Sequence, residues 1–504
     1  MPNSDTRPAR LAARLIRGAA SENYLVLLVG GATVLLLLGI GAFVTPDTWL
    51  ALTSGRVVAD GGPPSADSLT AWTLGRDWID QQWLGQLALY QIWSAGGLGL
   101  VGFVHVVIVI GTFAFALTVA RRSGGSSRHV ALVGLLAILP VGLVAGNIRT
   151  QTFALPLFVL VLWLLSRDSR APSRHVFLTF PLLVLWANVH GSVIVGAGLV
   201  AMAGVLAVAD GIRGKHSRIR IGHGAAMLAT VPLALLATPY GAALLTYLRD
   251  TFGNPEIAKI APEWMPTALE PVHAPFYLLA ALTVGLVARY RRQLTTFEQI
   301  ALAVLLVGAL AAERNLAWFA LAATLLLAPL WTPRRPARRD ALAPVGPALA
   351  VAAFTIVGVV VAAAQGLSAV QRQVESRFPP AAAAVVADIA RSDPSLELFT
   401  HPRYADWLIF RHPSLARRVP FDIRYELLTP RELRRFRRFR EQIGADWRDA
   451  IGSARLIVTD SSEQPLDVLP PTSAVLAREP GARLVYADHD LAVVLRPTSD
   501  TTRP

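Results

Sequence analysis

Cysteine is absent from this chain of 504 residues, and lysine nearly so, because Lys215 and Lys259 are its only lysines. The absence of cysteine excludes disulfide bonds, catalysis by a thiolate and metal sites with thiolate ligands. Charged residues make up only 16% of the chain, whereas hydrophobic residues make up 53%. So few charges exclude an ordinary soluble enzyme, and the composition predicts a polytopic membrane protein.

The net charge of the chain is +13. The arginines that produce it fall mostly in short clusters between apolar runs, as the orientation signals of membrane proteins do. We therefore expect no nucleic-acid partner.

The apolar runs predict a mostly helical protein with about eleven transmembrane helices. The first run, residues 24–45, would be roughly 33 Å long as a helix, which is enough to cross a membrane and too long for the apolar region of a signal peptide. Residues 1–23 before it form a basic amphipathic segment that is expected on the cytoplasmic surface. The other expected spans are 97–120, 129–146, 151–166, 175–189, 191–210, 224–240, 275–289, 297–311, 315–331 and 345–365.

Connections that are rich in arginine alternate with connections that are poor in it along these spans. Because basic connections stay in the cytoplasm, the N-terminus is expected inside and the residues after 366 outside. The expected domains are thus the segment 1–23, a transmembrane domain 24–366 with a long outer first loop 46–96, and an extracytoplasmic domain 367–504.

The last of these domains is polar and contains short apolar runs at 396–399, 456–458, 484–486 and 491–495. Helical stretches separate the runs, which predicts a small α/β domain. Its basic segment Arg431 to Glu441 is expected to be a helix with a solvated basic face over a packed apolar one. Asp422 and Arg424 are expected to form a structural pair.

Conspicuous polar residues collect on the extracytoplasmic side of this topology. Ionisable groups near the hydrocarbon are costly unless they are paired or lie in a wet cavity, so their presence at one depth predicts a site there. The first loop is also acidic and rich in tryptophan, which suits a substrate carried by a lipid. The candidate site residues are Asp47, Asp67, Arg149, Asn188, His190, Glu263 and Arg314.

The order of several short motifs resembles the GT-C class of membrane glycosyltransferases, and within it a largely uncharacterised bacterial branch. The resemblance covers nearly the whole chain, and it implies a GT-C-like transmembrane domain. The sequence differs from the pattern of the class after Trp49, where relatives often carry paired aromatics and a histidine. The motifs are P-D-T-W-L, P-S-A-D-S-L-T, W-I-D-Q-Q-W-L, N-I-R-T-Q-T-F, L-W-A-N-V-H-G, T-P-Y-G, P-E-W-M-P, V-P-F-D-I-R-Y and L-V-Y-A-D-H-D-L-A-V-V-L-R.

The resemblance implies an enzyme that transfers a sugar, with inversion, from a polyprenyl-phosphate-linked donor to a glycan, lipid or protein acceptor. It places the enzyme in a bacterial cytoplasmic membrane, in contact with membrane lipid. Asp47 matches the catalytic acid of the first loop and Asp67 a second carboxylate there, whereas Arg149 or Arg314 would stabilise the departing phosphate. No metal is expected to be obligatory, although Mg²⁺ or Mn²⁺ is used by some relatives.

Simpler interpretations stay open for each residue. Asp47 and Asp67 suit helix caps or turns, Arg149 and Arg314 suit membrane-surface anchors, and Asn188 and His190 suit hydrogen bonds between helices. Glu263 suits an interface position beside Trp264. Two other functions also stay open: an inactive scaffold for envelope assembly, and a transporter or flippase for lipid-linked sugars.

Overall fold

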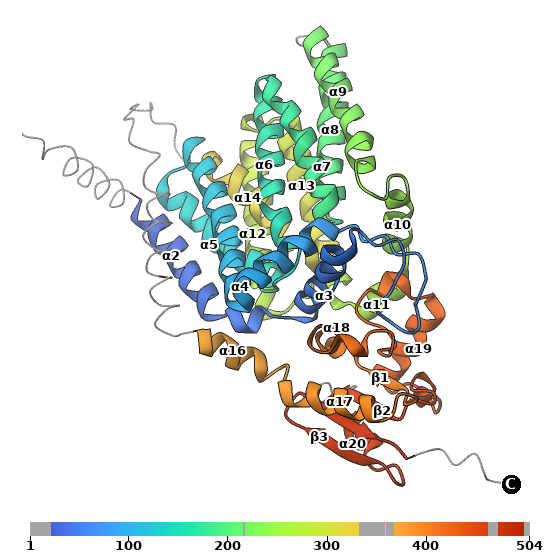
Figure 1. Cartoon of the computed structure of the whole chain (residues 1–504). Coiled ribbons are helices and arrows are strands. Elements are labelled where there is room, and N and C mark those ends of the chain that lie inside the picture. Colours follow the sequence, from blue (N-terminus) through green and yellow to red (C-terminus); the bar gives the residue numbers. More distant parts are fainter. Residues whose placement is uncertain (1–21, 215–216, 332–357, 359–366, 462–471, 498–504) are drawn as a thin grey trace, which may run out of the picture. The chain divides into compact units, whose positions relative to one another are not determined.

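The computed structural model describes residues 22–214, 217–331, 358, 367–461 and 472–497. The chain forms two compact units. Unit 1 comprises Met1–Ile40, Gly99–Ala242 and Glu263–Leu367, and unit 2 comprises Gly41–Leu98, Ala243–Pro262 and Ser368–Pro504. The described part of unit 1 is helical, whereas unit 2 combines helices with one sheet (Figure 1).

Unit 1 holds most of the apolar helices. Helix α4 (Trp83–Arg122) begins in unit 2 and continues into unit 1, and its helical geometry is interrupted at Gly96 and at Gly97, whose φ is +65°. Only glycine adopts that conformation readily. The other α-helices are α2 (Asn23–Leu38), α5 (Ser127–Ala145), α6 (Gln151–Arg170), α7 (Thr179–Val189), α8 (Val193–Ile212), α9 (Ser217–Leu236), α12 (Ala274–Tyr290), α13 (Thr296–Ala311) and α14 (Leu316–Leu327).

The predicted spans coincide with these helices. Within the described residues, seven helical segments are long and apolar enough to cross a membrane, and three shorter apolar helices accompany them. Each expected span from 24–45 to 315–331 overlaps one of them. The expected span 345–365, apart from residue 358, and residues 1–21 of the expected basic segment lie outside the described residues.

Helix α14 is the centre of unit 1. Every one of its residues is buried, as expected for a helix that is apolar on all sides. It packs against α5, α12, α13 and α6. The ring of Trp318 on this helix lies 5.1 Å from that of Phe158 and 5.9 Å from that of Trp186, centroid to centroid. This aromatic cluster joins α14 to α6 and α7.

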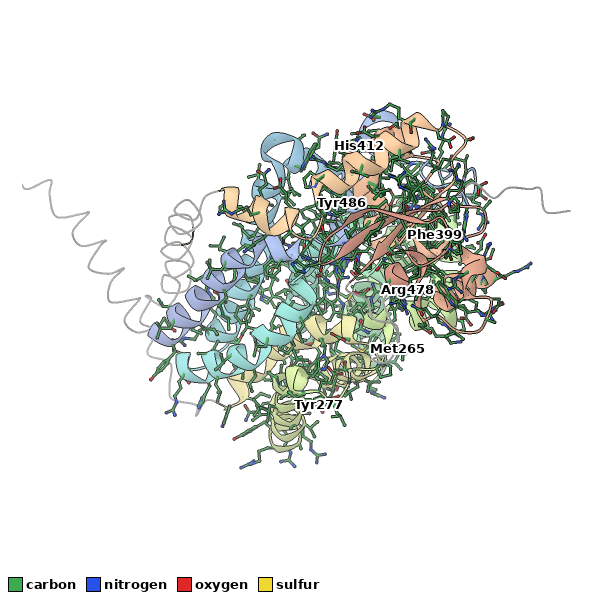
Figure 2. The ribbon with its side chains drawn as sticks, turned by 90° about the horizontal axis from the view of Figure 1, so that it is seen from below. Met265, Tyr277, Phe399, His412, Arg478 and Tyr486 are labelled. Carbon is green, nitrogen blue, oxygen red and sulfur yellow. The ribbon has the colours of Figure 1, made fainter. Side chains whose placement is uncertain are left out.

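Unit 2 contains a four-stranded sheet in the order β1-β2-β4-β3, formed by β1 (Leu398–Thr400), β2 (Leu456–Asp460), β3 (Arg483–Ala487) and β4 (Leu491–Leu495). Strand β1 is parallel to β2, and the other pairs are antiparallel, with Val458 opposite Val493. The central strand β2 is buried throughout. Phe399 and Tyr486 belong to the two edge strands (Figure 2).

The helices of unit 2 confirm the expected α/β character of the C-terminal region. Basic helix α19 buries Leu433, Phe436 and Phe439 and leaves most of its arginines at least partly exposed, which confirms the expected basic face over an apolar one. The α-helices are α3 (Pro46–Gly61), α10 (Ala243–Phe252), α11 (Pro255–Ile260), α16 (Leu367–Glu375), α17 (Pro380–Ser392), α18 (Pro402–Arg411), α19 (Pro430–Arg440) and α20 (Thr472–Leu476).

Candidate functional site

Four of the predicted site residues come together in unit 1, and each lies in a connection between helices. Arg149 lies just before α6, His190 between α7 and α8, and Arg314 in a short 3-10 helix between α13 and α14 (Glu313–Asn315). Glu263 lies in the 3-10 helix Pro262–Trp264. We call these four residues the Arg149 cluster.

Glu263 links the two arginines of the cluster. Nη1 of Arg149 donates a hydrogen bond to Oε2 of Glu263 over 2.7 Å. Nη1 of Arg314 lies 3.8 Å from Oε1 of the same carboxylate. The side chain of Arg149 is only 9% exposed, whereas that of Glu263 is 34% exposed. One carboxylate thus holds two guanidinium groups side by side, with a net charge of +1.

Trp264 also contacts Arg314. The guanidinium carbon of Arg314 lies 4.1 Å from the centre of the Trp264 ring. Such a cation–π contact favours a planar guanidinium over the ammonium group of lysine. The aromatic residue next to Glu263 therefore fixes the orientation of the second arginine.

His190 is a neutral hydrogen-bond donor in this cluster. Its Nδ1 accepts the backbone N–H of Ser192 over 3.0 Å and lies 2.8 Å from the Ser192 hydroxyl. Because Nδ1 is an acceptor, the neutral ring carries its proton on Nε2. Burial, with the charges of Arg314 and Arg149 acting in the same direction, lowers the pKa of His190 to about 3. The imidazole is therefore uncharged at neutral pH.

Glu263 is ionised. Burial of its carboxyl group opposes ionisation, but Arg149 and Arg314 outweigh it and lower the pKa of Glu263 to about 2. A group with this pKa is a poor general base at neutral pH. Its chemical contribution is thus to hold the arginines in place.

The backbone around the cluster is fixed by side-chain hydrogen bonds from unit 1. The ring of His105 on α4 bridges the carbonyl of Ala145 (2.8 Å) and the hydroxyl of Thr152 (2.9 Å), on either side of Arg149. The loop after Glu263 is tied to α13, because the Thr267 hydroxyl donates to the Ala309 carbonyl over 2.6 Å. The segments that carry Arg149 and Glu263 are therefore held by contacts within the protein itself.

Asn188 has a different environment. Its side-chain nitrogen donates to the carbonyls of Val184 and Ala237, each over 2.9 Å. These bonds tie the end of α7 to the segment after α9. They favour the structural interpretation of Asn188, and its predicted role in binding stays a prediction.

Asp47 lies in the first turn of α3 in unit 2. The backbone N–H of Thr45, the residue just before this helix, donates to the Thr48 hydroxyl over 3.0 Å. The capping side chain is therefore that of Thr48, and Asp47 is the second residue of the helix. Asp47 is half-buried. Negative charge is favoured at this position by the helix dipole. Trp49 anchors the helix against Phe378 and Phe410, with ring centres 5.5 and 5.6 Å away.

Asp67 lies in unit 2 and is buried in an ion pair. Nη2 of Arg424 lies 2.9 Å from one of its oxygens, and the hydroxyls of Thr70 and Thr73 donate to the other over 2.7 and 2.6 Å. Burial opposes ionisation of Asp67, but Arg424 and the hydroxyls lower its pKa below the usual value. Arg424 also binds Asp422 over 2.6 Å, which confirms the expected pair. These contacts favour a structural role for Asp67, and its catalytic role stays a prediction.

Divalent metal ions need several oxygen or nitrogen ligands at one point. Within the described residues, no group of three or more histidine, aspartate or glutamate side chains is placed to hold a metal ion. The carboxylate of Asp67 is already occupied by Arg424 and two threonines. The described donor groups therefore do not fit the Mg²⁺ or Mn²⁺ that the resemblance allows.

Two features of the cluster did not follow from the sequence motifs. Ser192 fixes the tautomer of His190, and its hydroxyl also accepts a hydrogen bond from the Trp186 ring over 3.0 Å. Trp264 stands next to Glu263 in P-E-W-M-P, but nothing in that motif predicts its contact with Arg314. Each of the two residues lies close in sequence to a predicted site residue, and this is the signal that the sequence offers.

No protein-family model matches the chain, and no curated protein matches its sequence. Solved structures do. The structure of ArnT from Cupriavidus metallidurans bound to undecaprenyl phosphate matches with a TM-score of 0.51 at 14% identity, over 95% of this chain and 98% of that one. The archaeal oligosaccharyltransferase AglB from Archaeoglobus fulgidus, in complex with an inhibitory peptide and a dolichol-phosphate, matches with a TM-score of 0.51 at 9% identity, over 88% and 69%.

The chain has a GT-C fold. This finding confirms the fold that the motifs predicted, and together with the apolar helices it makes the protein an integral membrane protein. At these identities the similarity establishes the GT-C fold.

Proposed function

We propose that the protein is a membrane glycosyltransferase that moves a sugar from a polyprenyl-phosphate carrier to a glycan, lipid or protein acceptor. The reaction takes place on the extracytoplasmic side of a bacterial cytoplasmic membrane, where the N-terminus faces the cytoplasm and the C-terminal region faces outward. The Arg149 cluster binds the phosphate of the donor.

The observation that carries this proposal is the pairing of Arg149 and Arg314 on one carboxylate. A phosphate attached to a lipid carries negative charge, and a guanidinium group meets two of its oxygens with a planar fork. The cluster offers two such groups, a net charge of +1, and the neutral N–H of His190. Cations in a partly buried site stabilise the charge that grows on a leaving phosphate.

The ligands of the similar structures support the same chemistry. ArnT was crystallised with undecaprenyl phosphate and AglB with a dolichol-phosphate. Both are long-chain lipid phosphates. A GT-C fold with an arginine pair at the ends of its helices suits a ligand of this class.

Asp47 is the proposed base. Its carboxylate takes the proton of the acceptor hydroxyl while the acceptor oxygen attacks the anomeric carbon of the sugar. The bond between that carbon and the phosphate oxygen breaks with its electron pair, and the lipid phosphate leaves with one more negative charge. One such displacement inverts the anomeric centre, and a positioned base typically contributes about 10²- to 10⁴-fold to the rate.

Substitution of Asp47 tests the proposal. We expect Asp47→Asn to lower transfer of radiolabelled sugar from a lipid-linked donor in proteoliposomes by about 100-fold or more, because the amide cannot accept the proton. Asp60→Asn is the matched control, since Asp60 lies on the same helix α3 and is exposed. Undiminished transfer by Asp47→Asn would exclude Asp47 as the base. A wild-type protein that binds lipid phosphate without transferring any sugar would instead favour the scaffold.

A further inference from the structure

A second cavity lies at the other end of the unit 1 helices. It has a volume of about 490 Å³ and is formed by the last turns of α4, α6 and α14 and the first turn of α13. Arg167 of its wall and Arg149 of the cluster lie near opposite ends of α6, roughly 27 Å apart along the helix at 1.5 Å per residue. The cavity is therefore distinct from the Arg149 cluster, and it lies at the arginine-rich end that is expected to face the cytoplasm.

The wall of this cavity has an apolar part and a polar part. Val119, Leu326 and Leu330 form the apolar part, and each is at most 9% exposed. The polar part is formed by Ser123, Ser166, Arg167, Arg170 and Glu298, among others. A ligand that fills both parts needs a polar head and an apolar stem.

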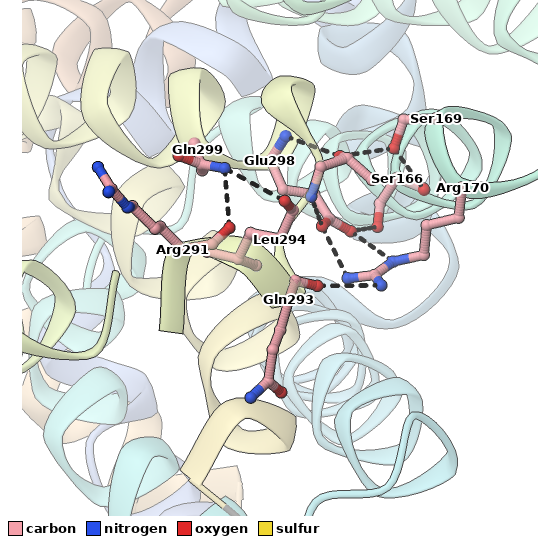
Figure 3. Close-up of polar contacts among 9 residues, drawn as sticks. Ser166, Ser169, Arg170, Arg291, Gln293, Leu294, Glu298 and Gln299 are labelled. Carbon is pink, nitrogen blue, oxygen red and sulfur yellow. Dashed lines mark hydrogen bonds and ion pairs between the residues drawn. The ribbon is translucent and has the colours of Figure 1, made fainter. Parts of the chain in front are cut away.

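Glu298 and Arg170 form the rigid side of the polar wall (Figure 3). Glu298 is fully buried, and it accepts hydrogen bonds from Nε and Nη2 of Arg170 over 2.9 and 2.7 Å. The Ser166 hydroxyl and the backbone N–H of Thr295 donate to the same carboxylate over 2.5 and 2.9 Å. With four donors, Glu298 has little capacity for a further partner, and it neutralises Arg170.

Arg167 carries a positive charge that Glu298 does not neutralise. Its side chain is exposed, its guanidinium carbon lies 5.9 Å from the centre of the Trp163 ring, and no carboxylate among the described residues pairs with it. Arg167 and Arg170 against Glu298 give the wall a net charge of +1. The charge that complements this wall is negative.

We infer that this cavity binds the headgroup of an anionic phospholipid. Its phosphate lies against Arg167 and the exposed edge of Arg170, and the start of an acyl chain lies along the apolar part of the wall. Basic pockets between transmembrane helices, at the depth where the helices reach the cytoplasmic surface, suit such headgroups because the lipid is already present there at high local concentration. This lipid is separate from the donor, which is proposed to bind at the opposite end.

Lipid binding to the purified full-length protein tests the inference. We expect the protein in detergent to bind phosphatidylglycerol or cardiolipin in preference to phosphatidylcholine, as measured by native mass spectrometry. Arg167→Gln should weaken this binding about fivefold, since one arginine near a headgroup contributes about that much. Ser123→Trp should weaken it as well, because the larger ring fills the cavity without removing a charge. Arg174→Gln is the matched control, since Arg174 is exposed at the same end but outside the cavity wall.

Three results would overturn the inference: equal binding of phosphatidylcholine, equal loss in Arg167→Gln and Arg174→Gln, or displacement of the lipid by millimolar inorganic phosphate, which would assign the cavity to a free anion. Arg170 is not a suitable test position, because its loss would leave Glu298 buried without its cation. The readout is lipid binding alone, so it does not depend on sugar transfer.

Discussion

Arg149 donates from Nη1 to Oε2 of Glu263 over 2.7 Å, although the two residues are 114 positions apart in the sequence. The bond links the start of α6 to the segment that precedes α12. It holds the guanidinium in one orientation before any ligand arrives. Such preorganised cations cost little reorganisation when charge develops on a phosphate.

Substitution of Arg149 should therefore impair transfer more than binding of the lipid alone. We expect Arg149→Lys, which keeps the charge and loses the planar fork, to lower kcat/KM at least tenfold, and Arg149→Gln to lower it about 10²- to 10³-fold. The measurement is sugar transfer at varied donor concentration. Arg292→Gln is the control, since Arg292 is an exposed arginine of unit 1 outside the cluster. An Arg149→Gln protein with the activity of that control would remove Arg149 from the reaction.

The apolar pattern of the sequence predicts most of the helices of unit 1, because a membrane requires this pattern in the helices that cross it. A helix must cross about 30 Å of hydrocarbon, so the length and polarity of each run nearly determine its structure. The alternation of arginine-rich and arginine-poor connections also placed Arg149, His190, Glu263 and Arg314 on one side. The structure brings these four together.

The partners of the individual residues could not be predicted in the same way. No local pattern links Asp67 to Arg424, since the pair depends on how the first loop and the C-terminal region fold together in unit 2. Asn188 illustrates the same limit, because its bond to Ala237 depends on where α9 ends. Motif order indicates which residues matter to a family, whereas tertiary packing decides which side chains they contact.

His190 should make the stability of the protein depend on pH in a defined window. Its pKa is lowered by burial from the ordinary value near 6.5 to about 3, so between these values the unfolded chain binds a proton that the folded protein does not. The free energy of unfolding therefore falls as the pH falls from 6.5 toward 3, by about 1.4 kcal/mol per pH unit at most. Glu263 acts in the same direction only below pH 4.5.

His190→Gln tests this dependence, because glutamine keeps a hydrogen-bond donor and does not titrate. We expect the midpoint of thermal unfolding in detergent to drop less between pH 7 and pH 5 in the variant than in the wild type. His489→Gln is the control, since His489 is exposed in the C-terminal region of unit 2. Parallel curves for wild type and His190→Gln would show that His190 is not held in its neutral form.

The ion pair of Arg424 with Asp67 and Asp422 should contribute to folding, since all three side chains are at most 2% exposed. Arg424→Met leaves two buried carboxylates without their cation, which typically costs about 3–5 kcal/mol. We expect a large fall in the thermal midpoint of the variant and a partial recovery when Asp67→Asn and Asp422→Asn are added.

Arg431→Met serves as the control for this series, because Arg431 is exposed on α19. A midpoint for Arg424→Met equal to that of the control would mean that the pair is not formed in solution. The series also separates the two first-loop carboxylates. Asp67→Asn should lower the amount of folded protein, whereas Asp47→Asn should lower the rate per folded molecule.

Asp406 is a different kind of buried acid. It lies on α18, is 1% exposed, and neither of its carboxylate oxygens has a hydrogen-bond partner among the described residues. Burial raises its pKa well above 3.8, and repulsion by Asp422 adds to the effect while Arg424 opposes it. The folded protein therefore keeps a proton on Asp406 that the unfolded chain releases near pH 4, so this residue makes the free energy of unfolding fall as the pH rises above 4.

Asp406→Asn should remove this fall in the free energy of unfolding above pH 4, because an amide has nearly the shape of the protonated acid and does not ionise. We expect the variant and the wild type to have similar thermal midpoints near pH 4 and the variant to be more stable at pH 7, by about 1.4 kcal/mol for each pH unit through which the acid is held protonated. Asp80 and Glu426, whose pKa values burial raises to about 7, titrate in both proteins and cancel in the difference. Asp388→Asn, at an exposed position on α17, should change neither midpoint. A variant that is less stable than the wild type at pH 7 would instead mean that Asp406 is ionised in the folded protein and that Arg424 is its counter-ion.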